Sequence, residues 1–412
     1  MSIFVSILGL GLLILIHEAG HFFVARVVGM NPRKFYLGFP PALVKTKRNG
    51  IEYGIGAIPL GGYVKIPGMH RPASGDLDAY FGRSVAEQPS LTSAVEELRR
   101  RLIASDYTSA RAAVATLAEE IKLAEISPAA RSSAERGLTE IDDALGPDAY
   151  WRARTWKRVA VIFAGPGANL VLAVALFAAL FMAGGGRATR TVDAVVSDTP
   201  AAAVGLRAGD RIVAIGGQAV AANEIAETIS SSEGRPLTLI VERDGERMAL
   251  GPVRPRETDG AYRLGFVLRG EGLGPLESSW QAIRVTGLVT KEIGASLGRL
   301  VTGEGRDEIS SPVGIVQVSS EQADQGTANY LWVLGLISLS LALLNLLPLL
   351  PLDGGHIMFS LIEGIRGKAV AREVYERVSA IGIAVVLLLF FIGLSNDIGR
   401  LTGEGFDLQN PR

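Results

Sequence analysis

Four apolar stretches divide the chain into alternating hydrophobic and polar segments. They run from about Ile3 to Val28, Val159 to Met182, Tyr330 to Leu350 and Val378 to Ser395. As helices they are long enough to cross a hydrocarbon core of roughly 30 Å, and the fourth is the shortest of them. The first stretch lacks the basic start and the small-residue cleavage site of a signal peptide, so we expect it to be a retained transmembrane helix.

The polar segment between the first two apolar stretches has two parts of different character. The run IEYGIGAIPLGGYVKI is β-like, and its Gly61 and Gly62 permit a tight bend. From about Ser90 to Leu145 the chain is rich in alanine and charge. Apolar residues recur there at helical spacing, as in Val95, Leu98, Leu102, Val114, Leu117 and Ile121. We expect a membrane-associated β-element and then two or three amphipathic helices, broken near Ser127 and Pro128.

The segment between the second and third apolar stretches predicts a small mixed domain of short strands and one helix, from about Thr191 to Leu268. Within it, TPAAAVGLRAGDRIVAIGGQAV resembles the core of a bacterial PDZ domain. The residues at that family's usual places are Leu206, Gly209, Asp210, Ile212 and Val213. The resemblance implies a domain that binds extended peptides by adding a strand to a sheet edge.

Lysines and arginines gather in the loop between the first two apolar stretches and in the loop between the last two. They are Arg26, Arg33, Lys34, Lys45, Lys47, Arg48, Arg152, Arg154, Lys157 and Arg158 in the first loop, and Arg366, Lys368, Arg372 and Arg377 in the second. Basic residues flanking membrane spans favour the cytoplasm, so both loops are predicted to be cytoplasmic. Both termini and the segment from about Gly184 to Asn329 then face outward, in a multi-pass membrane protein.

The predicted fold is a polytopic α-helical membrane protein with four transmembrane helices. It adds a membrane-associated β-element, a cytoplasmic helical insertion and one extracytoplasmic PDZ-like α/β domain. The expected boundaries are 1–30, 157–183, 330–357 and 378–396 for the transmembrane helices, the third ending in an LDG motif, 31–70 for the β-element, 71–150 for the insertion, 190–270 for the PDZ-like domain and 271–329 for an outward linker with an amphipathic helix.

Composition narrows the class of partner. With 412 residues and 48% hydrophobic content, the chain fits a membrane protein with soluble insertions. Its 41 basic and 42 acidic side chains give a net charge of −1, so nothing indicates a nucleic-acid partner, and the lipid bilayer is the expected surroundings. The absence of cysteine excludes disulfides, thiolate zinc sites and a cysteine nucleophile.

The first apolar stretch carries the sequence HEAGH, in which His17 and His21 are one helical turn apart. Two imidazoles on one helix face can share a tetrahedral metal ion, and Glu18 beside them can reach a metal-bound water. Three ionisable residues within a bilayer need compensation, which a divalent cation supplies. The alternative, an interfacial helix with its polar residues in water, is disfavoured because the residues before His17 are almost uniformly apolar.

A catalytic zinc needs a third protein ligand and an open position for water. No third histidine lies near His17 and His21, because His70 is in a loop beside the β-element and His356 follows the third helix. The best remaining ligand is Asp353 in NLLPLLPLDGGH. Prolines and glycines end an apolar helix there, and non-helical backbone at membrane depth is tolerated where it lines a cavity. The alternative is a structural role, in which Asp353 caps a helix at the membrane surface.

Several motifs together resemble the bacterial site-2 protease family of intramembrane metalloproteases. They are HEAGH in the first helix, GGYVK after it, AGPGAN opening the second, the outward PDZ-like domain, and N…P…LDG ending the third. The chain departs from the family's pattern in two places. Leu350 replaces the usual second proline, which falls at Pro351 instead, and the loop after GGYVK is expanded by the helical insertion, whose role the resemblance does not explain.

The resemblance implies that His17, His21 and Asp353 bind Zn²⁺ and that Glu18 is the general base. Asn345 matches an asparagine near the family's active site, where it either contacts the substrate or makes an interhelical contact. We further expect Gly61, Gly62, Tyr63 and Val64 to capture an unwound substrate strand by edge pairing, with a purely structural hairpin as the alternative.

The predicted function is zinc-dependent hydrolysis of peptide bonds within or near the transmembrane segment of a single-pass membrane protein. The implied role is the second cut of a regulated cascade, such as release of a sigma factor from its membrane anti-sigma factor. Two alternatives remain: a membrane metal transporter, for which the spans offer few polar residues, and a non-catalytic PDZ scaffold, which would not need His17, Glu18, His21 and Asp353.

Overall fold

The computed structural model describes residues 2–258, 260–306 and 309–402 of the chain. They form two compact units, each described here by itself. The first combines Met1–Val171, Ala295–Gln325 and Ile337–Arg412, and the second combines Leu172–Gly294 and Gly326–Leu336. The first unit holds the HEAGH and LDG motifs, the β-element and the helical insertion.

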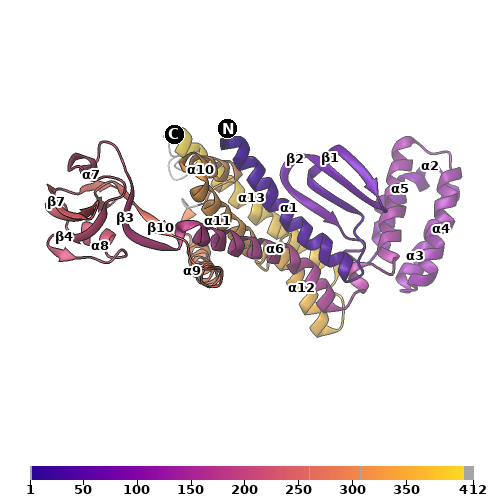
Figure 1. Cartoon of the computed structure of the whole chain (residues 1–412). Helices are drawn as coiled ribbons and strands as arrows, with labels where there is room; N and C mark the ends of the chain where they lie inside the picture. Colours follow the sequence, from indigo (N-terminus) through magenta and orange to yellow (C-terminus); the bar gives the residue numbers. More distant parts are fainter. Residues whose placement is uncertain (1, 259, 307–308, 403–412) are drawn as a thin grey trace. The chain divides into compact units, whose positions relative to one another are not determined.

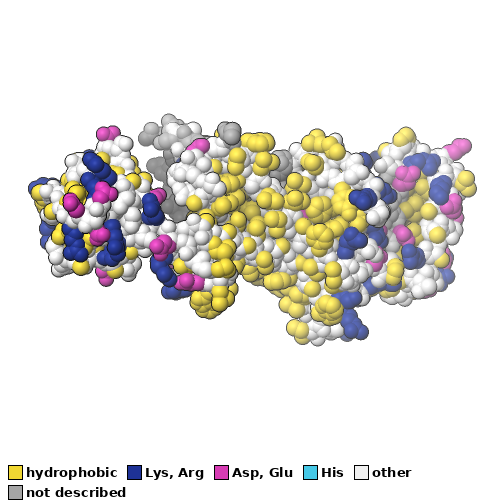
Figure 2. All heavy atoms as spheres, in the orientation of Figure 1, with side chains coloured by type: hydrophobic (Ala, Val, Ile, Leu, Met, Phe, Trp, Pro, Cys, Tyr) yellow, Lys and Arg dark blue, Asp and Glu magenta, His cyan; other side chains and the backbone are white. Residues whose placement is uncertain are grey.

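Four helices in the described part of the chain are long and apolar enough to cross a membrane. They are α1 (Ser2–Val27), α6 (Thr155–Leu180), α11 (Thr327–Asn345) and α13 (Arg372–Thr402). In the most apolar windows of α1 and α13, 17% and 11% of the residues are buried within the protein. Hydrophobic side chains therefore form a broad surface over the long helices (Figure 2), as is expected of helices in contact with lipid.

The β-element consists of two long, bent strands, β1 (Lys34–Arg48) and β2 (Ile51–Lys65), beside α1 (Figure 1). Residues 42–48 pair with 51–56, whereas residues 34–37 pair with 52–55 on one side and with 62–65 on the other. The GGYVK segment therefore forms an edge of the small sheet. Phe22 of α1 contacts the rings of Phe35 and Tyr53, so the sheet packs against the helix that carries HEAGH.

The helical insertion contains four helices, and three of them lie within 90–145, where two or three are expected. They are α2 (Ser74–Glu87), α3 (Thr92–Ile103), α4 (Tyr107–Leu123) and α5 (Pro128–Leu145). Leu77, Phe81, Leu98 and Leu117 are at most 1% exposed and form their shared core. The hydroxyl of Ser127 accepts a hydrogen bond from Ala130 N and caps α5, at the expected break.

Ion pairs attach this insertion to the ends of the β-element. Lys65, the last residue of GGYVK, places its Nζ 2.7 Å from Glu140 Oε1 and 3.4 Å from Asp143 Oδ2 of α5. Arg33, just before β1, contacts Asp143 at 2.7 Å and Asp148 at 3.0 Å. Since Asp143 is buried and receives both cations, the insertion fixes the start of β1 and the end of β2 together.

The second unit contains a β-rich domain. Its strands are β3 (Arg187–Val195), β4 (Arg211–Ile215), β5 (Gln218–Ala219), β6 (Leu237–Arg243), β7 (Glu246–Val253), β8 (Arg256–Thr258), β9 (Ala261–Arg263) and β10 (Phe266–Glu271), with the short helices α7 (Pro200–Ala203) and α8 (Ile225–Ser230). The main sheet has the order β10-β3-β4-β6-β7, and β5 pairs with β4. Ile212, Ile215 and Leu239 fill its core.

This domain contains a buried ion pair between Asp210 and Arg243. Asp210 is 1% exposed, accepts two hydrogen bonds from Arg243 and one from the backbone N–H of Arg207. Burial acts to raise the pKa of Asp210, but the hydrogen bonds from Arg243 outweigh it and hold that pKa below its ordinary value. The acidic residue singled out in the PDZ-like sequence therefore has a structural partner.

The segment expected to hold one amphipathic helix contains two, α9 (Pro275–Thr302) and α10 (Pro312–Gln325). In the first unit, Asp397 of α13 is 2% exposed and accepts hydrogen bonds from Ser311 N at 2.7 Å and Gly314 N at 3.0 Å. It thereby caps the start of α10, because the first N–H groups of a helix have no partner within the helix. Helix α12 (Asp353–Arg366), between α11 and α13, begins at the LDG motif.

Candidate active site

Helix α1 brings the two histidines of HEAGH to one side. His17 and His21 are 8% and 7% exposed, and their Nε2 atoms lie 3.2 Å apart. Residues four apart on a helix are stacked neighbours, so the sequence spacing alone produces this pair. Two nitrogen atoms therefore converge on one point in the interior of the first unit.

Helix α12 supplies the third group. Asp353 is its first residue, and the Oδ2 atom lies 3.2 Å from His17 Nε2 and 3.4 Å from His21 Nε2. A Cβ atom on Gly354 would collide with the carbonyl oxygens of Leu346 and Leu347, and one on Gly355 would lie 2.6 Å from Leu350 N. The glycines of LDGG thus let α12 start directly against the irregular chain that follows α11, and this close approach places the carboxylate.

The three donor atoms fit a tetrahedral zinc ion. Zinc bonds of about 2.0–2.2 Å to nitrogen and oxygen place neighbouring ligand atoms about 3.3–3.5 Å apart. The observed separations of 3.2, 3.2 and 3.4 Å agree with that geometry. Among the described residues, these three are the group of histidine, cysteine and acidic side chains that could hold a metal ion.

The other two histidines lie elsewhere. Both contact Tyr375: the ring of His70 stacks edge-on at 4.6 Å between centroids, and His356 Nδ1 is hydrogen bonded to the tyrosine hydroxyl. The expectation that the third ligand is not a histidine therefore agrees with the geometry.

Contacts behind the two imidazoles fix their orientation. His21 Nδ1 lies 2.8 Å from the carbonyl oxygen of Val161, so it must carry the proton and donate it. This leaves Nε2 with its lone pair toward the ligand cluster. Gly165 of the GPGAN motif makes room for the ring, because a Cβ atom at that position would collide with His21 Nε2.

His17 has a different partner, Asn169 of α6. The Asn169 side chain is fully buried, with Nδ2 3.5 Å from His17 Nδ1 and Oδ1 lacking any hydrogen-bond partner among the described residues. With His17 Nε2 directed at the cluster, Nδ1 must bear the proton. If the Asn169 amide is flipped, its Oδ1 faces His17 and accepts the proton of Nδ1. Both buried groups, Asn169 Oδ1 and His17 Nδ1–H, then have a hydrogen-bond partner.

Replacing Asn169 by leucine is therefore expected to weaken zinc binding by about 10- to 100-fold, the usual effect of losing a group that orients a metal ligand. Titration of the metal-free variant against a competing chelator measures this affinity. Asn169→Asp keeps an acceptor and should bind zinc nearly as the wild type does. Ser338→Ala is the control, because that hydroxyl donates to the backbone oxygen of Asn169 at 2.8 Å and does not reach His17. Equal affinity in Asn169→Leu and wild type would contradict the assignment.

Glu18 lies between the cluster and the edge of the β-element. A Cβ atom on Gly62 would approach Glu18 Cγ to 2.7 Å, and the backbone of Val64 adjoins the Glu18 carboxylate. The GGYVK strand therefore passes directly along this carboxylate. Glycine at position 62 is required by the close approach, since a larger residue would displace Glu18.

Tyr36 supports that strand from its paired side. Its ring stacks on Tyr63 at 5.2 Å, and its hydroxyl donates to Glu52 Oε1 at 2.6 Å. Burial and this hydrogen bond raise the pKa of Tyr36 to about 12. The tyrosine consequently stays protonated and keeps the two neighbouring strands in register.

Asn345, the last residue of α11, uses its side-chain amide within its own helix. Nδ2 donates to the Leu341 carbonyl at 3.0 Å, one turn back. The substrate contact expected of Asn345 would require this bond to break. Leu350, where the related family usually has proline, is fully buried, so the leucine is part of the packing of the turn.

Comparisons with known proteins bear on the class of enzyme. The profile of peptidase family M50 matches residues 5–389. A protein of Agrobacterium fabrum whose name places it among zinc metalloproteases is 31% identical, over 96% of this chain and 95% of the relative. The zinc metalloprotease RasP of Geobacillus kaustophilus is 29% identical, over 97% and 98%, and the Eep protease of Enterococcus faecalis is 28% identical, over 97% and 99%.

A zinc metalloendopeptidase of membrane character is the class that these findings define. The chain belongs to peptidase family M50, the site-2 protease family, and is similar to RasP and Eep along nearly its whole length. The resemblance and the enzyme class expected from the sequence are thus confirmed. The alternatives of a metal transporter and of a non-catalytic scaffold find no support in these comparisons.

Sequence reasoning missed three contributors to the site. They are the side chain of Asn169, the space that Gly165 leaves for the His21 ring, and the carbonyl of Val161, for which the sequence carries no signal. A polar residue four positions after Gly165, inside an apolar helix, was the available clue to Asn169. Which residue Asn169 contacts depends on how α6 packs against α1, and the sequence alone does not specify that packing.

Proposed function

We propose that this protein hydrolyses peptide bonds within or near the transmembrane segments of single-pass membrane proteins, with His17, His21 and Asp353 as zinc ligands and Glu18 as general base. The observation that carries the proposal is the convergence of three ligand atoms, within 3.4 Å of one another, beside a carboxylate on a helix otherwise suited to lipid. Such polar groups are costly in a bilayer without a cation.

Zinc held by these ligands supplies Lewis-acid polarisation of the scissile carbonyl. Glu18 takes a proton from the attacking water and delivers it to the leaving amine, since its carboxylate adjoins both the cluster and the GGYVK strand. His21, donating to Val161, and His17, paired with Asn169, hold their rings in position.

The GGYVK strand is proposed to hold the substrate. A helical substrate hides its carbonyls in its own hydrogen bonds, so it must unwind before hydrolysis. Residues 62–65 have a strand partner on one side, and the backbone of Val64 adjoins Glu18. An extended segment pairing with the open side would lie next to the general base.

Val64→Pro tests this role, because proline removes one backbone donor from the edge. We expect cleavage to fall by about tenfold or more, as the loss of one or two hydrogen bonds predicts, with zinc content unchanged. Val64→Ile keeps the donor and should cleave normally. Unchanged proteolysis in Val64→Pro would leave the strand as a structural hairpin.

The proposed setting is the bacterial inner membrane, with four spans and with the β-rich domain and both termini outside the cytoplasm. The substrate class fits an anti-sigma factor already shortened by an outside cut. The β-rich domain, as a PDZ-like module, would then bind the new carboxyl end or exclude uncut substrates. Its outermost strands β7 and β10 each have one neighbour in the main sheet and offer edges for a peptide.

A reconstituted assay tests the whole proposal. Full-length protein in liposomes should cut a model single-pass peptide inside its apolar segment, as mass spectrometry of the fragments would show. A zinc chelator should stop the reaction, and added zinc should restore it. Cleavage confined to soluble loops, or cleavage indifferent to chelation, would overturn it.

A further inference from the structure

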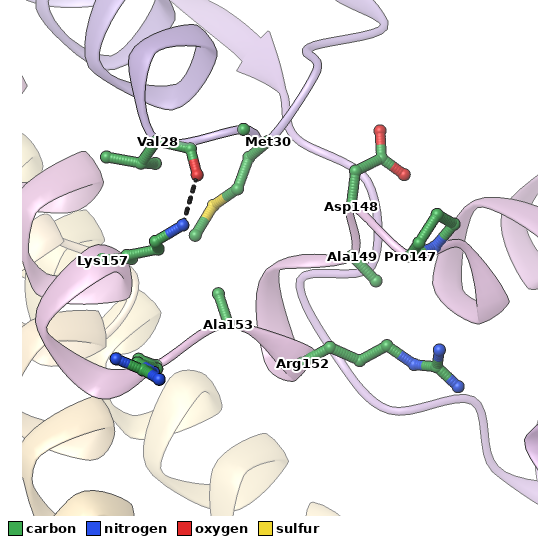
Figure 3. Close-up of a pocket in the computed structure, with 10 residues that line it drawn as sticks. Val28, Met30, Pro147, Asp148, Ala149, Arg152, Ala153 and Lys157 are labelled. Atoms are coloured by element: carbon green, nitrogen blue, oxygen red, sulfur yellow. Dashed lines mark hydrogen bonds between the residues drawn. The ribbon is translucent and has the colours of Figure 1, made fainter.

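A cavity of about 430 Å³ opens where α1 ends and the chain enters α6 (Figure 3). Val28, Gly29 and Met30 form one wall, and Pro147, Asp148 and Ala149 form another. The remaining lining comes from residues 152–154 and Lys157. In Figure 3, Lys157 reaches toward Val28 on one side of the hollow, and Asp148 and Arg152 lie across from it.

The cavity carries an excess of positive charge. Arg152, Arg154 and Lys157 line it, and within the described residues none of the three has a carboxylate as ion-pair partner. Asp148 is already engaged, because Arg33 contacts its two oxygens at 3.0 and 3.3 Å. Burial opposes ionisation of Asp148, but the hydrogen bonds from Arg33 prevail and lower its pKa. The three cations and Asp148 together give the lining a net charge of +2, which favours an anion.

The end of α1 offers little that would repel an anion. Its carbonyl oxygens on Ala25 and Arg26 accept hydrogen bonds from Met30 N and Gly29 N. Lys157 Nζ donates to Val28 O at 2.8 Å, which occupies one of its three donors and leaves the others for a ligand. The helix end is thus capped, and unsatisfied donors remain.

Apolar surface adjoins the charged hollow. Phe23 and Val27 in the last turns of α1 are 62% and 86% exposed. Trp156, in the first turn of α6, is 58% exposed, and Lys157 lies 5.8 Å from its ring centre. Exposed tryptophan beside basic residues at the end of a membrane helix is typical of the headgroup level of a bilayer.

We propose that this cavity binds the phosphate of an anionic phospholipid, with the acyl chains lying along the exposed side chains of α1. The proposal rests on α1 and α6 spanning the bilayer, as proposed above. A soluble phosphate offers the same charge, but it would leave the adjoining apolar surface unused. Basic pockets between membrane helices on the cytoplasmic side are suited to anionic headgroups. Bound there, the lipid would contact the ends of both helices that position the zinc-site imidazoles.

The test uses spin-labelled phosphatidylglycerol and phosphatidylcholine with full-length Glu18→Gln protein in phosphatidylcholine liposomes. Electron paramagnetic resonance measures the fraction of each lipid held at the protein. Working in the Glu18→Gln background separates this result from proteolysis, so the failure of either proposal is seen independently. The cavity variant is Arg152→Gln with Arg154→Gln, which leaves the cap formed by Lys157 intact. The matched control is Arg366→Gln with Lys368→Gln, exposed charges predicted on the same membrane face but outside the cavity.

We expect a preference for phosphatidylglycerol of about fivefold or more, as one unpaired cation near a membrane surface predicts. It should fall to about one in the cavity variant and persist in the control. The proposal would be overturned if the Glu18→Gln protein without further substitution showed no preference for phosphatidylglycerol. An equal loss of that preference in the cavity variant and in the control would also overturn it. Loss of the preference on adding millimolar inorganic phosphate, at constant ionic strength, would assign the site to a soluble anion and overturn the lipid assignment.

Discussion

Glu18→Gln is expected to lower peptide hydrolysis by about 10²- to 10⁴-fold, the range that a positioned general base contributes, while zinc content stays unchanged. Glutamine keeps the shape that packs against Gly62, so the strand and the three ligands should remain in place. What is lost is the ability to accept a proton from water. Cleavage rates on the model peptide and metal analysis of the same preparation measure the two quantities together.

The matched control for Glu18→Gln is Glu119→Gln on α4, an exposed glutamate paired with Lys122. It makes the same chemical change far along the chain from the site and should leave cleavage as in the wild type. Full activity in Glu18→Gln would remove the general-base assignment. Loss of zinc together with activity would instead show that the carboxylate supports the metal site itself.

The part of the site that could be predicted from the sequence depends on local geometry and on chemical need. HEAGH places His17 and His21 together because a helix repeats nearly every four residues, whatever surrounds it. Asp353 lies more than 300 positions later, but a catalytic zinc on a histidine pair needs a third protein ligand, and few candidates exist in the apolar stretches. The structure brings Asp353 to both imidazoles.

The contacts that orient the ligands depend on packing between helices and could not be predicted. A Cβ atom on Gly20 would collide with the backbone of Ala164, so α1 and α6 approach very closely there. This approach delivers Val161 O to His21 and Asn169 to His17. No local pattern encodes which atoms such a crossing will place opposite one another.

The fold, like the site, has parts that could be predicted from the sequence and parts that could not. The apolar stretches gave the four long helices, although polar residues at both ends extend α13 to 31 residues, well beyond its expected span. Helix α2 was not predicted, because its apolar stripe is short, with Leu77 and Phe81, and is flanked by Gly75 and Gly82. The double pairing of β1 was also beyond prediction, since a bent strand changes partners along its length and the sequence records no register.

Asp353→Ala is expected to weaken zinc binding by more than about a hundredfold, a larger effect than the loss of a group that orients a ligand. Two neutral imidazoles remain, and they lack the carboxylate charge and the third protein donor of a catalytic zinc site. Purified protein should then carry little zinc and show no cleavage. Zinc quantification, read beside chelator competition, gives the occupancy and the affinity without relying on activity.

Asp78→Ala controls for the removal of an aspartate, because Asp78 is exposed on α2 and pairs with Arg99 at 2.6 Å. It should bind zinc as the wild type does. Asp353→Glu supplies a further comparison: the carboxylate is kept but lies one methylene farther out, in a cluster whose atoms are already 3.2–3.4 Å apart. We expect partial zinc binding with disturbed cleavage there, since the donor survives but its position shifts. Wild-type zinc affinity in Asp353→Ala would mean that another group completes the site, and the two-helix metal centre would have to be abandoned.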